Sequence, residues 1–233
     1  MNVSREDIVD GVMEARILEA EKNGLFKRMT MEDRDKSRND TLAKLPVGSD
    51  IWLFGYGSLM WNPTIEYEAR IPARIYGYHR QFCLWTWMGR GTPEQPGLML
   101  ALQAGGSCDG FAYKVSRQLA EEELKIVWNR EMISNAYVPR IVSLHTADGN
   151  VPGIVFVINR QHERYAGKLE PENMIDALAH AEGPIGRCCD YLFSTVEHMD
   201  ELGIGDGAMH DLARRVRTRQ AEYALVSILE KMP

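Results

Sequence analysis

A short segment, IWLFGYGSLMWNP at residues 51–63, places two glycines and a serine directly after an apolar, strand-like run. Gly55 and Gly57 leave the backbone bare, and a bare backbone lets amide N–H groups approach a small anionic or carbonyl-bearing ligand closely. The same glycines also suit a tight bend at the rim of a barrel, which needs no ligand. The segment therefore predicts either a binding loop or a structural bend, and the spacing alone favours neither.

Two familiar glycine motifs do not fit this segment. A dinucleotide fingerprint, G-x-G-x-x-G, needs its third glycine where Met60 stands, and Pro63 interrupts the helix that should follow. A nucleophile elbow, G-x-S-x-G, needs a glycine two residues after the serine, whereas Leu59 and Met60 follow Ser58. We therefore expect neither a dinucleotide site nor a serine nucleophile here.

The second candidate for chemistry is Glu131, at the end of a predicted helix over residues 117–131. It continues the apolar face that carries Trp128, and no basic residue is placed for an i,i+4 ion pair along the helix. Burial without a close cation would raise the pKa of this carboxyl into the range useful to a general base. The alternative is a glutamate that turns out to water and pairs with Arg130 or Arg140.

Histidine and cysteine spacing predicts no metal site. The six histidines show no H-E-x-x-H or other paired spacing. The four cysteines form no C-x-x-C pair, and adjacent cysteines are poorly placed to bridge or to share a tetrahedral metal. We expect reduced, structural thiols at Cys83, Cys108, Cys188 and Cys189.

The elements that must position these residues follow from hydrophobic periodicity. Seven short β-rich runs, which suit a closed or strongly curved sheet, are predicted at residues 51–55, 73–78, 81–87, 98–102, 109–115, 140–145 and 153–158. Helices are predicted at residues 117–131, 171–182, 189–202 and 207–231.

The first 48 residues differ from the rest of the chain in their hydrophobic pattern. Residues 1–48 are polar and helical in pattern, and Ser4 with Asp7 forms a capping-box-like helix start. The charged run at 30–40 is typical of a solvated connector. We therefore predict a helical extension over residues 1–48, which packs on the body or on a second subunit, and one globular domain over residues 49–233.

Composition limits the partners. The chain has 233 residues and a formal net charge of −6 without a basic block, which is not the pattern of a nucleic-acid-binding protein. No stretch approaches 18 apolar residues and the first residues are charged, so we expect no membrane span and a cytoplasmic location. No pattern specifies an oligomeric state.

Four segments together resemble the bacterial ChaC-type γ-glutamylcyclotransferases. They are FGYGSLMWNP, GRGTPEQPGLMLAL, WNREMI followed by Tyr137, and GPIGRCCDYL, in the order and approximate spacing of that family, from about residue 51 to 225. The resemblance implies an α+β fold in which a small mixed, mostly antiparallel β-barrel is flanked by helices. It also implies an enzyme that splits glutathione into 5-oxoproline and cysteinylglycine without metal or cofactor.

The resemblance also implies roles for individual residues. The family's catalytic glutamate, a general acid/base, falls on Glu131. Its substrate-binding loop falls on Leu53, Phe54, Gly55, Tyr56, Gly57 and Ser58. Cys188 and Ile185 depart from the asparagine and serine of some relatives, so we expect that wall of the pocket to differ.

Glutathione carries net negative charge and so does this chain, so local arginines must offset the repulsion. Arg80, Arg90 and Arg187 are the candidates for the carboxylate at the glycine end. Two other functions stay open at this point: cyclisation of another γ-glutamyl amide or dipeptide, and a non-catalytic protein that senses glutathione.

Overall fold

The computed structural model describes residues 3–229, with side chains through residue 226. The chain divides into two compact units. The barrel unit contains the chain up to Gln81 and the segment Leu100–Tyr165. The helical unit contains Phe82–Met99 and the chain from Ala166 onward.

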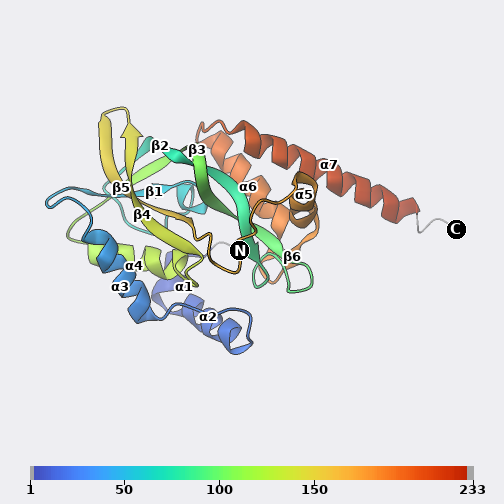
Figure 1. Cartoon of the computed structure of the whole chain (residues 1–233), viewed down its shortest axis with the longest axis horizontal. Coiled ribbons are helices and arrows are strands. Elements are labelled where there is room, and N and C mark those ends of the chain that lie inside the picture. The colour runs from blue at the N-terminus through green and yellow to red at the C-terminus, as the bar shows by residue number, and fades with distance from the viewer. Residues whose placement is uncertain (1–2, 230–233) are drawn as a thin grey trace. The chain divides into compact units, whose positions relative to one another are not determined.

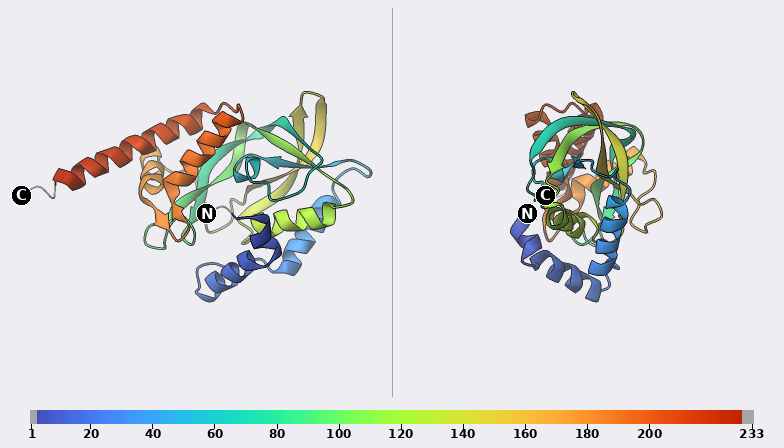
Figure 2. Two further views of the ribbon diagram at one scale, coloured as in Figure 1. Left: turned by 180° about the vertical axis from the view of Figure 1, so that it is seen from behind. Right: turned by 90° about the vertical axis from the view of Figure 1, so that its left-hand side faces the viewer.

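The barrel unit is built on a closed five-stranded barrel in the order β1-β3-β2-β4-β5 (Figure 1). Strand β1 pairs antiparallel with β3, β4 pairs antiparallel with both β2 and β5, and β1 closes the barrel by running parallel to β5. The prediction of a mixed, mostly antiparallel barrel is confirmed, and Figure 2 shows the strands curving around one another. The bounds are β1 Ile51–Gly55, β2 Ala69–Thr86, β3 Gly97–Val115, β4 Tyr137–Thr146 and β5 Gly149–Ile158.

The seven predicted strands form five, because two pairs of them are continuous. The runs at 73–78 and 81–87 lie in β2, and those at 98–102 and 109–115 lie in β3. Polar residues and glycines between the runs suggested turns, but they lie within long strands. Most of them are exposed or half-buried, and the buried Arg80 donates hydrogen bonds to backbone carbonyl oxygens. A strand tolerates polar residues wherever one of its faces meets water.

Four helices belong to the barrel unit: α1 Arg5–Val9, α2 Val12–Lys22, α3 Met31–Leu42 and α4 Ala120–Glu131. The predicted helical character of the first 48 residues is confirmed, as is the capping box of Ser4 and Asp7. Both α1 and α3 pack against α4 (Figure 2). The boundary at residue 48 stays a prediction.

The expectation of a solvated connector at residues 30–40 is wrong, because this run is helix α3. Thr30 and Asp33 form a capping box that satisfies the first N–H groups of the helix. Two of its charged side chains are buried and paired: Arg34 with Glu14 at 2.6 Å and Arg38 with Asp35 at 2.6 Å. The charge in this run therefore serves packing as well as solvation.

Helix α4 presents its apolar face to the barrel. Leu124, Val127 and Trp128 are fully buried, and the Trp128 ring meets Phe156 of β5 edge-on at 5.0 Å between centroids. Burial of a tryptophan and its neighbours is worth several kcal/mol, about 25 cal/mol per Å² of apolar area. This packing fixes α4 against the barrel, and Glu131 is the last residue of the helix.

The helical unit contains α5 Pro171–His180, α6 Cys188–Glu201 and α7 Gly207–Leu229. Two short strands, β6 Glu182–Gly183 and β7 Gly186–Arg187, connect α5 to α6. The three helices predicted in this region are confirmed, and residues 230 and 231 of the last one lie outside the described residues.

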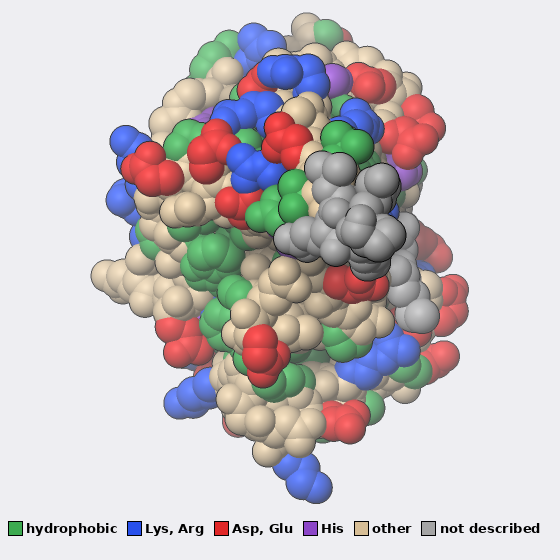
Figure 3. All heavy atoms as spheres, turned by 90° about the vertical axis from the view of Figure 1, so that its right-hand side faces the viewer, with side chains coloured by type: hydrophobic (Ala, Val, Ile, Leu, Met, Phe, Trp, Pro, Cys, Tyr) green, Lys and Arg blue, Asp and Glu red, His purple; other side chains and the backbone are tan. Residues whose placement is uncertain are grey.

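Charges of both signs are interspersed on the surface drawn in Figure 3. Within the helical unit, Arg215 of α7 pairs with Glu172 of α5 at 2.6 Å. Among the described residues, no helix combines the length and the apolar character needed to span a bilayer.

Candidate active site

The glycine-flanked loop leaves the end of a fully buried strand. Leu53 and Phe54 are completely buried in the barrel, and Tyr56 is buried as well, whereas Ser58 is half-buried at the start of a 3-10 helix. A Cβ at position 55 would lie 3.0 Å from the Tyr113 ring, so a larger residue than Gly55 would have to push this ring aside. The predicted bend is therefore present, and the part of the loop nearest solvent is its Ser58 end.

Two side chains of barrel strands, Tyr113 and Arg80, bind the backbone of the loop through hydrogen bonds. The Tyr113 hydroxyl of β3 lies 2.9 Å from the carbonyl oxygens of both Leu59 and Met60. The Arg80 guanidinium of β2 donates from Nε to the carbonyl oxygen of Tyr56 at 2.6 Å. These bonds hold the backbone of the loop in one conformation.

Arg80 was one candidate for binding the glycine-end carboxylate, but its guanidinium binds backbone carbonyl oxygens of the protein. Its side chain is buried, and besides Tyr56 it also donates to the carbonyl oxygen of Asp109 on β3. It therefore links β3 to the loop and supports the loop rather than lining its exposed side.

Glu131 is largely buried, with 16% of its side chain exposed. Burial raises the pKa of this carboxyl, and the positive charge of Arg130 opposes the rise. The expectation of a carboxylate without a close cation is wrong, because Arg130 Nε lies 3.2 Å from Glu131 Oε1. The expected direction of the pKa change nevertheless holds, since desolvation outweighs this single contact.

Arg130 connects Glu131 to the loop. Its Nη2 donates to Ser58 Oγ at 2.7 Å, and its Nη1 donates to the carbonyl oxygen of Asn62 at 2.5 Å. The structure thus brings together Glu131 and Ser58, two predicted site residues 73 positions apart in the chain, on one guanidinium group. The sequence indicated Arg130 only as a possible ion-pair partner of Glu131 and missed this bridge.

The other two arginine candidates belong to the helical unit. Arg90 Nη1 donates to the carbonyl oxygen of Arg187 at 2.8 Å, and the Arg187 side chain pairs with Asp190 at 2.8 Å. Nearby, Cys188 Sγ lies 3.2 Å from the backbone N–H and C=O of Leu98. Cys188 therefore anchors α6 to the start of β3.

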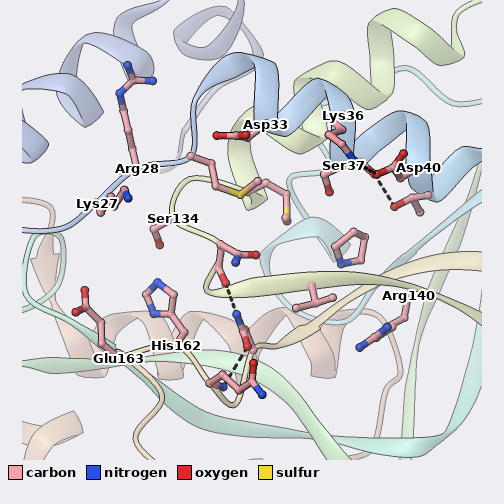
Figure 4. A pocket seen from close by; sticks show the side chains of 18 of the residues that line it. Lys27, Arg28, Asp33, Lys36, Ser37, Asp40, Ser134, Arg140, His162 and Glu163 are labelled. Carbon is pink, nitrogen blue, oxygen red and sulfur yellow. Dashed lines mark hydrogen bonds and ion pairs between the residues drawn. The ribbon is translucent and has the colours of Figure 1, made fainter.

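A separate polar groove of about 900 Å³ lies in the barrel unit, between α3 and the segments around residues 132–140 and 159–163 (Figure 4). Its lining does not include Glu131 or residues 53–58. Lysines, arginines and carboxylates are mixed within it, and Lys36 pairs with Asp40 at 2.6 Å. In the part of the chain that the structure describes, no three His, Cys, Asp or Glu side chains could jointly hold a metal ion.

Comparison with known proteins relates this site to a family. The family model described as ChaC-like protein matches residues 51–219. The glutathione-specific gamma-glutamylcyclotransferase of Escherichia coli (strain K12) is 40% identical over 192 residues, which cover 82% of this chain and 83% of that protein. Gamma-glutamylcyclotransferase 2-3 of Arabidopsis thaliana is 30% identical over 176 residues, covering 72% of this chain and 88% of that protein.

The fold is also similar to a solved structure. A crystal structure of a yeast gamma-glutamyl cyclotransferase specific to glutathione has a TM-score of 0.66 and 22% sequence identity. The match covers 73% of this chain and 97% of that chain, so the predicted fold class is confirmed. The family match includes both the loop and Glu131, whereas α1, α2 and α3 precede it.

Proposed function

The chain belongs to the ChaC-like protein family, and on that premise we propose that it is a glutathione-specific γ-glutamylcyclotransferase. Its products are 5-oxoproline and cysteinylglycine. The observation that carries the proposal is a buried carboxylate, Glu131, held next to the glycine-flanked loop within the matched region.

The substrate supplies its own nucleophile in this reaction. The α-amine of the γ-glutamyl group attacks the γ-carbonyl carbon, so one C–N bond forms to close a five-membered lactam. The C–N bond to the cysteine nitrogen then breaks. Holding a flexible chain in such a near-attack geometry is worth up to about 7–11 kcal/mol of the barrier. A site of this kind therefore works mainly by folding and orienting its ligand.

Glu131 is the proposed general acid/base. The α-amine of a peptide has a reference pKa of about 8 and arrives mostly protonated at neutral pH. Glu131 takes the proton from the ammonium group and later returns a proton to the departing amine of cysteinylglycine. The raised pKa of Glu131 suits both steps, because it brings the carboxyl nearer to the pKa of the group it serves.

The loop is the proposed site for the polar groups of the γ-glutamyl end. Backbone N–H groups from Tyr56 to Ser58 hold the α-carboxylate and stabilise the oxyanion that develops on the γ-carbonyl oxygen. Leu53, Phe54 and Gly55 contribute through the shape of the strand end, since their side chains or backbone are buried. Tyr113 and Arg80 support this role by holding the loop backbone rigid before the ligand arrives.

The test is to incubate the purified protein with glutathione and to measure 5-oxoproline and cysteinylglycine by mass spectrometry. Equal amounts of both products are expected, and Glu131→Gln should lower kcat/KM by about 100-fold or more; a variant that retained more than about a tenth of the wild-type value would refute the base assignment. Faster turnover of γ-Glu-Ala would transfer the proposal to another γ-glutamyl substrate. Binding of glutathione without turnover of either compound would favour a sensor and would refute the enzyme.

A further inference from the structure

One guanidinium group contacts both parts of the proposed site. Arg130 Nε lies 3.2 Å from the Glu131 carboxylate, and Nη2 of the same side chain donates to Ser58 Oγ at 2.7 Å. We propose that Arg130 is a positioning residue, which holds the carboxylate of Glu131 beside the Ser58 end of the loop. This inference rests on the proposed function, because it assigns Arg130 a part in the same reaction.

The guanidinium is itself held in place. Its Nη1 donates to the carbonyl oxygen of Asn62 at 2.5 Å and lies 3.4 Å from Thr64 Oγ1. Only 10% of the Arg130 side chain is exposed. An arginine uses a rigid planar fork to bind several acceptors at once, and a lysine cannot reproduce that geometry. The arrangement therefore fixes the distance between α4 and the loop, and not only a charge.

The segment that anchors Arg130 is unusual in its backbone. Thr64 has φ of 60°, a left-handed conformation that a β-branched residue rarely adopts. Its carbonyl oxygen accepts a hydrogen bond from Arg5 of α1 at 3.2 Å, and Asn62 Nδ2 donates to the carbonyl oxygen of Val3 at 2.8 Å. Strained residues persist where surrounding contacts over-determine them, and they are frequent at functional sites. The contacts of this segment therefore support a fixed position for Arg130.

Arg130 also acts on the charge of Glu131. Burial raises the pKa of Glu131, and the adjacent positive charge limits that rise. A fully neutral environment would keep the carboxyl protonated at higher pH and remove the base from action. The same side chain thus keeps the carboxylate ionised and oriented, which are two separable effects.

Arg130→Gln and Arg130→Lys separate these effects, and Arg140→Gln is the matched control, since it removes an exposed arginine from the same unit. For Arg130→Gln we expect kcat to fall by about 10- to 100-fold. The acid limb of kcat/KM should move up by about 1 pH unit, because the opposing charge is gone. For Arg130→Lys we expect a similar loss of kcat with an acid limb near that of the wild type. Arg140→Gln should change neither.

Each outcome decides between the two proposals. Wild-type kcat and an unchanged acid limb in Arg130→Gln would overturn the role of Arg130 and leave the proposed function intact. If wild-type protein does not turn over glutathione, the proposed function fails. An NMR titration of Glu131 in wild type and Arg130→Gln would then show whether the charge coupling exists, and equal titrations would refute it. If thermal melts show that Arg130→Gln is unfolded, the Arg130→Lys data decide alone: unchanged kcat would refute the role.

Discussion

Two glutamates at opposite ends of α4 show how the same residue type acquires different properties. Glu123, in the first turn, has 2% of its side chain exposed and accepts hydrogen bonds at 2.6 and 2.7 Å from Arg5 and at 2.9 Å from the backbone N–H of Glu66. Glu131, in the last turn, has 16% exposed and a single ion pair at 3.2 Å.

The opposite pKa changes follow from the number of partners. Burial raises the pKa of Glu123, but the hydrogen bonds from Arg5 and Glu66 and the charge of Arg5 together lower it below the ordinary value. At Glu131 burial is opposed by one charge only, and the pKa is raised. A carboxylate with several hydrogen-bond and ion-pair partners stays ionised and links the elements that supply them. A buried carboxylate with few partners can exchange a proton near neutral pH. The number of partners, more than burial, therefore sets the direction of the pKa change at these two glutamates.

The largest expected effect is on activity. Glu131→Gln should lower kcat/KM by at least about 100-fold, since it removes the proposed base. Glu123→Gln should lower it by less than about tenfold once the folded fraction is accounted for, because this carboxylate lies a helix length away. Steady-state kinetics with glutathione measures kcat/KM for the two variants. Equal losses in both variants would break the distinction between the two carboxylates.

On stability the order is reversed, and Glu123→Gln should have the larger effect of the two variants. Glu123→Gln should lower the free energy of unfolding by about 2–3 kcal/mol, somewhat less than the 3–5 for a fully buried pair, because Arg5 stays 28% exposed. The melting temperature should then fall by about 4–12 °C. Glu131→Gln removes a buried charge with one partner, so its melting temperature should stay near that of the wild type. Calorimetry of both variants measures this, and a strongly destabilised Glu131→Gln would contradict it.

The opposite pKa changes of the two glutamates should appear in two different quantities, stability for Glu123 and activity for Glu131, both of which fall in acid. The lowered pKa of Glu123 contributes stability that is present above the unfolded-state value of about 4.3 and is lost as pH falls through the folded-state pKa. The stability gap between wild type and Glu123→Gln should therefore close in acid. The raised pKa of Glu131 places the acid limb of kcat/KM above about 4.3, the ordinary value for a glutamate. An acid limb at or below that value would contradict the assignment of Glu131.

The smallest effect concerns the geometry of the Glu123 pair. Arg5→Lys keeps the charge but loses the two-pronged contact, so we expect a loss of about 1 kcal/mol in the free energy of unfolding. Urea denaturation of wild type and variant measures it. Lys36→Arg, in the exposed pair with Asp40, is the control and should leave the denaturation midpoint unchanged. If Arg5→Lys lowered the free energy of unfolding no more than Lys36→Arg does, the two-pronged contact of Arg5 would contribute no more to stability than the exposed pair.

The sequence predicted the features that depend on neighbouring residues. The strand before Gly55, the helix that carries Glu131 and the capping box at Ser4 all follow from local patterns, and the structure contains each of them. The roles of Leu53 to Ser58 and of Glu131 in the reaction came from the family resemblance and stay proposals. Local patterns thus predicted the helices and strands that carry the site, but not the roles of its residues in a reaction.

What the sequence did not predict depends on contacts across the chain. Arg130 and Ser58 are 72 positions apart, and no periodicity links them. Arg130 was an expected partner only for a Glu131 that turns out to water, since the i,i+4 rule places no cation beside a buried one. At a helix end, however, the long side chain of the preceding residue reaches the buried carboxylate. The run at 30–40 was predicted as a solvated connector because composition does not reveal that Arg34 is buried against Glu14 of α2. The pair of Arg38 with Asp35 and the capping box of Thr30 and Asp33 are local contacts, which charge composition alone does not distinguish from a solvated run.

The four cysteines have a practical consequence for assays of this protein. All four cysteines are buried in the reduced form, and burial raises the pKa of Cys83 to about 12 and that of Cys188 to about 11. The thiolate is the form that attacks an electrophilic reagent such as a maleimide, so thiols with a raised pKa react slowly at neutral pH. Glutathione and cysteinylglycine carry exposed, ordinary thiols. A maleimide added to a running reaction should therefore label the peptides and spare the protein, so substrate and product can be trapped in place while the catalyst stays intact.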